Sequence, residues 1–256
     1  FGSLTAGSYT ITVKDANGCT KTQAVTITQP LAALTASITA QTNVDCFGNN
    51  NGSVTVAGAN GTAPYTYAKD GITFVASGTF GSLAAGSYTI TVKDANGCTK
   101  TQAVTITQPL AAITCSIIQN KAVSSNGLSD GQATVTPLGG NGGYNYLWDN
   151  GETTMQAVGL NAGSHTVTVT DSKGCKTTCD VTISQPNVLS CSISQDETAK
   201  CFGDSNGKAT ITAIGGNGDY TYLWDNGETT MQAVGLNAGS HTATVTDKLG
   251  YKTTCN

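Results

Sequence analysis

The nine cysteines of this 256-residue chain occupy recurring positions, and disulfide formation is the chemistry that their spacing favours. The number of residues from Cys115 to Cys179 equals the number from Cys191 to Cys255. In the related stretch 31–109, the positions equivalent to Cys115 and Cys179 hold Ala36 and Gln102, so both cysteines of the pair are missing together. Paired gain and loss is what a covalent contact produces, and we predict a bridge within each pair.

We also predict from the spacing a disulfide between Cys46 and Cys98. Cys19 is the repeat equivalent of Cys98, so its partner is expected upstream of residue 1. Cys175 and Cys201 lack an assigned partner, because their partner positions hold Ser and Tyr. These two cysteines are free, pair with each other, or pair with another chain.

Two other interpretations of the cysteines stay open. All nine can be reduced thiols that act as small apolar residues. The spacing Cys175-x-x-x-Cys179, with His165 nearby, also approaches that of a zinc site. However, Tyr251 replaces the first of these cysteines in the next repeat. Regular spacing in a repetitive chain favours an oxidising compartment over either alternative.

The remaining candidate groups are two histidines and two acidic turns. His165 and His241 each follow Gly-Ser on the inward face of an expected strand. No nucleophile is arranged beside them, so we predict a structural role and no catalysis. The Trp-Asp-Asn-Gly-Glu turns make weak calcium candidates, since two carboxylates supply only part of the shell that calcium needs. These candidates are Asp149, Glu152, Asp225 and Glu228.

Long internal repeats organise the elements that carry these groups. Residues 1–33 recur at 80–112 with a single change, and residues 146–166 recur unchanged at 222–242. Gln-Pro separates successive units. The expected organisation is the C-terminal part of one repeat, two whole repeats, and a repeat that lacks its last strand end: 1–30, 31–109, 110–186 and 187–256. The pattern is already under way at residue 1, which indicates a piece of a longer protein.

Alternation of apolar and polar residues predicts β-strands throughout each repeat. Tyr88, Ile90 and Val92 share one face, and the threonines between them suit a solvent-exposed face. Asn96-Gly97 then favours a hairpin turn. Further strands are expected at 34–40, 53–58, 64–68, 72–75 and 98–107. About seven short strands per repeat predict a two-sheet, Ig-like or PKD-like β-sandwich, with Trp148 and Trp224 as core aromatics.

In such a sandwich the first and last strands run parallel and side by side, which places Cys115 next to Cys179 and Cys191 next to Cys255. Short joints that contain proline favour a semi-rigid, elongated rod of tandem domains. Repetition also speaks against catalysis, because an active site is usually a single arrangement. We therefore expect no enzyme and no cofactor.

Composition excludes several classes of partner. All 12 of the basic residues are lysines, and the formal net charge is −4, so a nucleic-acid partner is not expected. An anionic membrane surface requires basic clusters, which the sequence lacks. The apolar runs are also too short for a transmembrane segment, and we expect no direct membrane insertion.

The combined motifs resemble the SprB repeat of giant cell-surface adhesins of gliding Bacteroidetes, along essentially the whole chain. They are Cys46-Phe47-Gly48, Asn51 to Val56, Pro64 to Tyr67, Leu83 to Val92, and Asp94 to Cys98. The repeats depart from this pattern at Ser125, at Tyr251 and at Ala63-Pro64. These departures make the disulfide scheme specific to each repeat.

The resemblance implies a secreted stalk or adhesive region that is exported by type IX secretion and attached to the outer membrane through other regions of the protein. It implies the secretion and gliding machinery, a surface polysaccharide or another substratum, and neighbouring repeats as partners. Gliding follows from attachment to the substratum. The alternative is a glycan-binding accessory module of a secreted polysaccharide-degrading enzyme.

Overall fold

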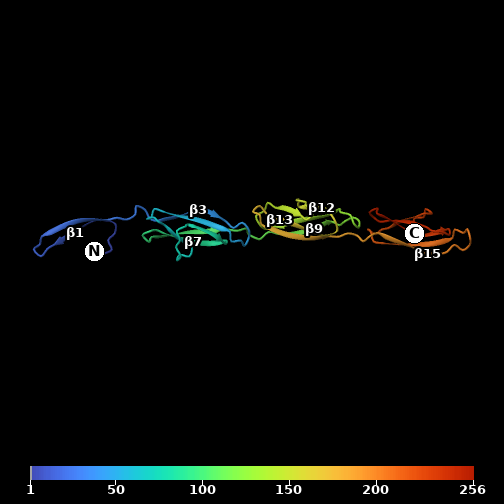
Figure 1. Cartoon of the computed structure of the whole chain (residues 1–256), viewed down its shortest axis with the longest axis horizontal. Helices are drawn as coiled ribbons and strands as arrows, with labels where there is room; N and C mark the ends of the chain where they lie inside the picture. The colour runs from blue at the N-terminus through green and yellow to red at the C-terminus, as the bar shows by residue number, and fades with distance from the viewer. Residues whose placement is uncertain (1) are drawn as a thin grey trace. The chain divides into compact units, whose positions relative to one another are not determined.

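The computed structural model describes residues 2–256, which form strands β1 to β20 and no helix (Figure 1). The chain divides into two compact units, Phe1–Leu110 and Ala111–Asn256. In the first unit, β1 (Gly7–Lys14) and β2 (Thr20–Ile27) make an antiparallel hairpin. The all-β architecture that the alternation predicts is confirmed.

Segment 31–109 completes the first unit with two three-stranded antiparallel sheets. One sheet has the order β3-β4-β6 and the other β5-β7-β8. The bounds are β3 (Thr35–Thr42), β4 (Gly52–Ala59), β5 (Thr66–Ala68), β6 (Thr79–Leu83), β7 (Gly86–Lys93) and β8 (Thr99–Ile106). The expected strand at 72–75 is wrong. Only Val75 bridges to Tyr67, and the strand that pairs with β4 is β6.

The second unit contains the same pair of sheets twice. In segment 110–186 the orders are β12-β10-β9 and β11-β13-β14, and in segment 187–256 they are β15-β16-β18 and β17-β19-β20. The first set is β9 (Thr114–Lys121), β10 (Gly131–Leu138), β11 (Asn145–Trp148), β12 (Gln156–Leu160), β13 (Gly163–Thr170) and β14 (Lys176–Ile183). The second is β15 (Ser190–Glu197), β16 (Gly207–Ile214), β17 (Thr221–Trp224), β18 (Gln232–Leu236), β19 (Ala243–Thr246) and β20 (Lys252–Cys255).

Each core lies between the two sheets and is built from every second residue of the strands. Ile90 and Val92 on β7 are fully buried, whereas Tyr88 at the edge of the same face is partly buried. Trp148 and Trp224 are 2% exposed, and each donates its indole N–H to a backbone carbonyl. Burial of the apolar face is the main stabilising contribution, and the indole hydrogen bonds remove the cost of burying that polar group.

The first and last strands of a repeat run parallel and meet across the two sheets. At the far end of β9, the Val123 N–H donates to the Ser184 carbonyl at 2.9 Å. At the near end, Gly140 N–H donates to Ala111 O at 3.0 Å, beside the β13–β14 turn. The chain therefore enters the repeat at the end that holds this turn. It leaves at the opposite end, which holds the loop between β9 and β10.

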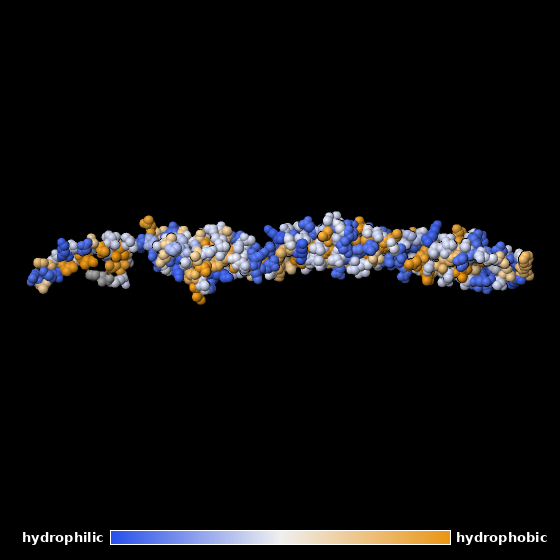
Figure 2. Space-filling view, viewed as in Figure 1, coloured by the Kyte–Doolittle hydropathy of each residue, from blue (hydrophilic) through white to orange (hydrophobic). Residues whose placement is uncertain are grey.

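We call these the turn end and the loop end. In segment 110–186 the turn end contains the β13–β14 turn Asp171–Cys175, and the loop end contains Ser124–Leu128. The face of residues 2–256 that Figure 2 shows is mainly polar or weakly hydrophobic, with small separate apolar areas. Dispersed apolar residues of this kind are ordinary for a soluble surface.

Candidate functional site

Two disulfides join the first and last strands of the repeats in the second unit. Cys115 on β9 is bonded to Cys179 on β14, with their Cα atoms 6.1 Å apart. Cys191 on β15 is bonded to Cys255 on β20, with their Cα atoms 5.7 Å apart. Both bridges span 64 residues, because the two strands are parallel and keep the same register in each repeat. Each bridge covalently connects one sheet of the sandwich to the other.

The expected Cys46–Cys98 bridge is not formed, because Cys98 is free and exposed. Cys98 precedes β8, at the turn end of its repeat. Cys46 lies in the loop at the other end, where Val44 N–H bonds to Thr107 O and Gly48 N–H bonds to the Gln108 side chain. The eight residues of β8 separate the two ends by about 26 Å, far beyond disulfide range.

The three cysteines outside the predicted pairs, Cys19, Cys175 and Cys201, differ in their surroundings. Cys19 and Cys201 are free and exposed. Cys175 is buried, its Sγ lies 3.7 Å from Asn141 Nδ2, and neither it nor Cys46 is a free cysteine. Because Cys179 is held in a disulfide, it is not available as a zinc ligand. Within residues 2–256, no group of three His, Cys, Asp or Glu side chains is placed to hold a metal ion.

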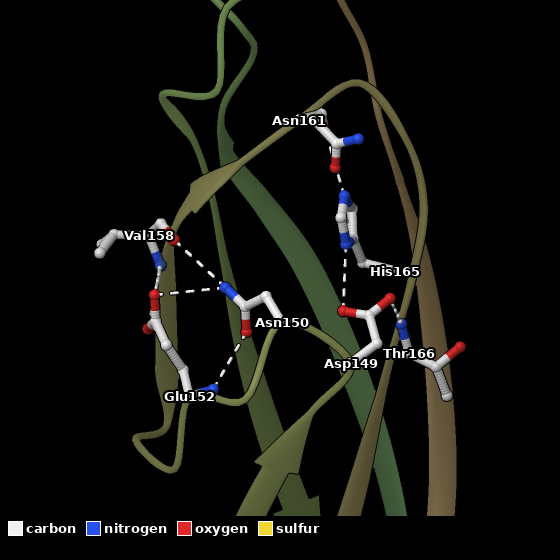
Figure 3. Close-up of polar contacts among 7 residues, drawn as sticks. All are labelled: Asp149, Asn150, Glu152, Val158, Asn161, His165 and Thr166. Carbon is white, nitrogen blue, oxygen red and sulfur yellow. Dashed lines mark hydrogen bonds and ion pairs between the residues drawn. The ribbon is translucent and has the colours of Figure 1, made fainter.

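The Trp-Asp-Asn-Gly-Glu turn positions His165 against Asp149 (Figure 3). Asp149 Oδ1 lies 3.1 Å from His165 Nδ1, and its other oxygen accepts from Thr166 N–H at 3.2 Å. His165 Nε2 donates to Asn161 O at 3.0 Å. The imidazole therefore connects three backbone segments at the loop end of the sandwich, and it is mostly buried there.

Glu152 of the same turn points away from the histidine (Figure 3). Its carboxylate accepts from Val158 N–H at 3.2 Å, and Asn150 Nδ2 lies 3.3 Å from the same group. The two carboxylates of the turn thus make separate hydrogen bonds on either side of Asn150. Asp225 and Glu228 repeat this arrangement with His241 and Val234. In both turns the calcium candidates hold the backbone of the turn.

The local hydrogen bonds favour the charged form of His241. The bond to Asn237 O, followed by that to Asp225, raises the pKa of His241 above 6.5, although burial opposes the shift. A histidine whose pKa is raised by folding stabilises the fold fully below its unfolded pKa. That contribution is lost as pH rises through the higher folded value.

We expect His241→Tyr to remove this pH dependence, because Tyr88 occupies the same position in segment 31–109 and bonds to Ala84 O with an uncharged hydroxyl. Thermal unfolding of segment 187–256 between pH 5 and pH 8 measures it. The melting temperature of the natural chain should fall relative to that of the variant as pH rises. Parallel profiles for the two chains would contradict the assignment.

A buried aspartate that sequence reasoning missed organises each turn end. Asp171 is 2% exposed and accepts from Asn141 N–H at 2.8 Å, Lys173 N–H at 2.9 Å and Cys175 N–H at 3.0 Å. Burial acts to raise the pKa of Asp171, but these hydrogen bonds outweigh it and hold the pKa below 3.8. The carboxylate thereby fixes both the β13–β14 turn and the loop that faces it.

The same aspartate recurs in the other repeats. Asp94 accepts from Thr62, Asn96 and Cys98 N–H, and Asp247 accepts from Asn217, Leu249 and Tyr251 N–H. The signal in the sequence is an Asp that always stands four residues before the cysteine or tyrosine of the turn. A prediction of the turn from Asn-Gly alone overlooks the role of this aspartate. The sequence does not show that a second loop, which contains residue 62, 141 or 217 in the three repeats, faces the turn.

The chain matches a known family in three places. The SprB repeat model matches residues 38–74, 123–153 and 198–229, one segment in each of the three longer repeats. No curated protein matches the chain. Residues 2–256 contain no helix of the length and hydrophobicity that a membrane span requires.

Several solved structures of tandem domains are similar at low identity. The three N-terminal domains of the bacteriophage RB49 Highly Immunogenic Outer Capsid protein share 16% identity over 88% of this chain and 98% of that one, with a TM-score of 0.38. A tetra-tandem repeat from the extending region of a large adhesion protein shares 16% over 99% and 81%, with a TM-score of 0.30. The human desmocollin-1 ectodomain shares 13% over 96% and 63%, also with a TM-score of 0.30.

Proposed function

This chain carries tandem SprB repeats, and from that premise we propose that it is a structural and adhesive region of a secreted cell-surface adhesin. The observation that carries the proposal is the way each repeat receives the chain at one end and passes it on at the other. Within the second unit, the domains at 110–186 and 187–256 follow one another end to end, and we expect each further repeat to add length in the same way. A semi-rigid rod that presents many equal surfaces is the function that this connectivity suits.

The disulfides support an extracellular location, because such bridges persist in oxidising compartments. In segment 110–186, tension enters at Ala111 and leaves near Gln185, at opposite ends of β9 and β14. The two parallel strands are thus loaded in shear, and the bridge between Cys115 and Cys179 carries the load from one to the other. Stability under tension is what attachment to a substratum requires. Gliding, type IX secretion and anchoring at the outer membrane belong to the same proposal.

Adhesion that depends on many weak contacts is tested with beads coated at controlled density. We expect attachment of beads to glass or to a polysaccharide-coated surface to rise more steeply than in proportion to density, because linked weak sites act together. A single chain in solution is expected to bind the same polysaccharide only weakly, at millimolar concentration. Beads coated with an unrelated tandem β-sandwich protein of similar length and charge serve as the control.

Calorimetry with soluble polysaccharide separates the proposal from its alternative. Micromolar binding by one chain, with bead attachment in simple proportion to density, would favour a glycan-binding accessory module. Equal attachment of control beads would contradict adhesion and leave only a role in providing length.

A further inference from the structure

Within the second compact unit, the loop end of segment 110–186 contacts the turn end of segment 187–256. Ser124 Oγ lies 2.9 Å from the hydroxyl of Tyr251. Asn217 Nδ2 donates to the Ser124 carbonyl, also at 2.9 Å. Both contacts are partly buried and join residues far apart in the sequence. They form a polar joint between two successive repeats.

Each side of this joint is held in place by its own repeat. Ser124 donates its hydroxyl to Asp130 at 2.6 Å and its backbone N–H at 2.9 Å, and Lys121 pairs with the same carboxylate. Since the Ser124 proton is used in that bond, Tyr251 is the donor across the joint. Tyr251 N–H and Asn217 are in turn fixed by Asp247. Two surfaces organised before they meet lose little freedom on docking.

The repeats place cysteines at the position of Tyr251 and at the position directly after Ser124. The residue after Ser124 and its repeat equivalents define a loop position, occupied by Cys46, Ser125 and Cys201. The equivalents of Tyr251 define a turn position, occupied by Cys19, Cys98, Cys175 and Tyr251. Where the joint within the second unit is observed, both positions hold residues other than cysteine, and a hydrogen bond connects its two sides.

The loop end of segment 187–256 presents the same features without a covering partner among residues 2–256. Cys201 is free and exposed, and the adjacent residue Phe202 is fully exposed. Cys201 and Phe202 are therefore both accessible to a docking partner, and aromatic residues are enriched at protein–protein interfaces.

We propose that the loop end of segment 187–256 docks on the turn end of another SprB repeat, with Cys201 forming a disulfide to a cysteine at the turn position. The geometry is that of the Ser124–Tyr251 joint. Two thiols lose two protons and two electrons as the S–S bond forms, and a small-molecule disulfide takes these up and leaves as two thiols. The inference does not depend on what the array adheres to.

The observed joint offers a direct test inside one chain. Ser125→Cys and Tyr251→Cys are introduced together, with Cys19, Cys98 and Cys201 changed to Ser. After refolding with oxidised glutathione, non-reducing peptide mapping is expected to find a bond between positions 125 and 251. The matched control keeps Ser125 and Cys201 and changes only Tyr251→Cys. It should give no bond between 201 and 251, which lie at opposite ends of one repeat. A bond in the control but none in the test variant would overturn the proposal.

A second test uses only exposed cysteines, so that folding is not at stake. One copy carries Cys201→Ser, and the other carries Cys19→Ser and Cys98→Ser. With oxidised glutathione, the mixture is expected to form linked dimers that join Cys201 to Cys98 or Cys19, while each copy alone gives at least tenfold less. Phe202→Ser in the second copy should reduce the yield severalfold. Dimers through Cys201 on both sides, or an unchanged yield with Phe202→Ser, would refute docking of the two ends.

Discussion

Single-molecule pulling on the two termini is expected to release about 230 Å more length from each disulfide-bonded repeat when reductant is present. Each bridge closes a loop of 64 residues, and an extended residue spans at most about 3.6 Å. While the bridge is intact, tension passes from the first strand to the last and bypasses the residues between them. Reduction places those residues under tension for the first time.

Segment 31–109 is the internal control for this measurement. Ala36 and Gln102 stand at its bridge positions and Cys98 is free, so in a chain that carries Cys46→Ser its release of length should be the same with and without reductant. Cys115→Ser combined with Cys179→Ser should give segment 110–186 the reduced behaviour under oxidising conditions, and should destabilise it by about 4 kcal/mol for a loop of this size. Equal release from all three repeats under both conditions would show that the bridges do not carry the load.

Asp171→Ala is expected to destabilise segment 110–186 by about 3 kcal/mol. The substitution leaves the backbone N–H groups of Asn141, Lys173 and Cys175 without their charged acceptor in a buried turn. Denaturant unfolding measures the loss. Asp149→Ala is the comparison, since that carboxylate is 40% exposed and its replacement should cost less than about 1 kcal/mol. Equal losses from the two variants would contradict the central place of Asp171.

The dependence of stability on acid pH is a second, independent test of the role of Asp171. Because folding lowers the pKa of Asp171, its contribution to stability is present above the unfolded pKa of about 3.9 and is lost as pH falls through the lower folded value. The natural chain should therefore lose more stability than Asp171→Ala between pH 5 and pH 2.

Strand alternation and the repeats could be predicted from the sequence. Alternation depends only on neighbouring residues in a strand, and the repeats are found by comparing segments of the chain. Alternation from Tyr88 to Val92 predicts which side chains face the core, and burial of Ile90 and Val92 confirms it. Parallel first and last strands were expected from the β-sandwich, and the 64-residue register follows them. The prediction of a strand at 72–75 was wrong, because β-propensity over four residues does not reveal which segment pairs with β4.

The sequence by itself determined that the chain repeats, that each repeat is a two-sheet sandwich, and that Cys115 and Cys191 occupy the same place in successive repeats. Only the tertiary structure decided that Cys46 and Cys98 lie at opposite ends of a domain, that Asp171 holds the turn, and that Tyr251 reaches Ser124 of the preceding repeat. The physical reason is range. Strand alternation is set by adjacent residues, whereas the two ends of a sandwich are defined only after strands distant in sequence have paired.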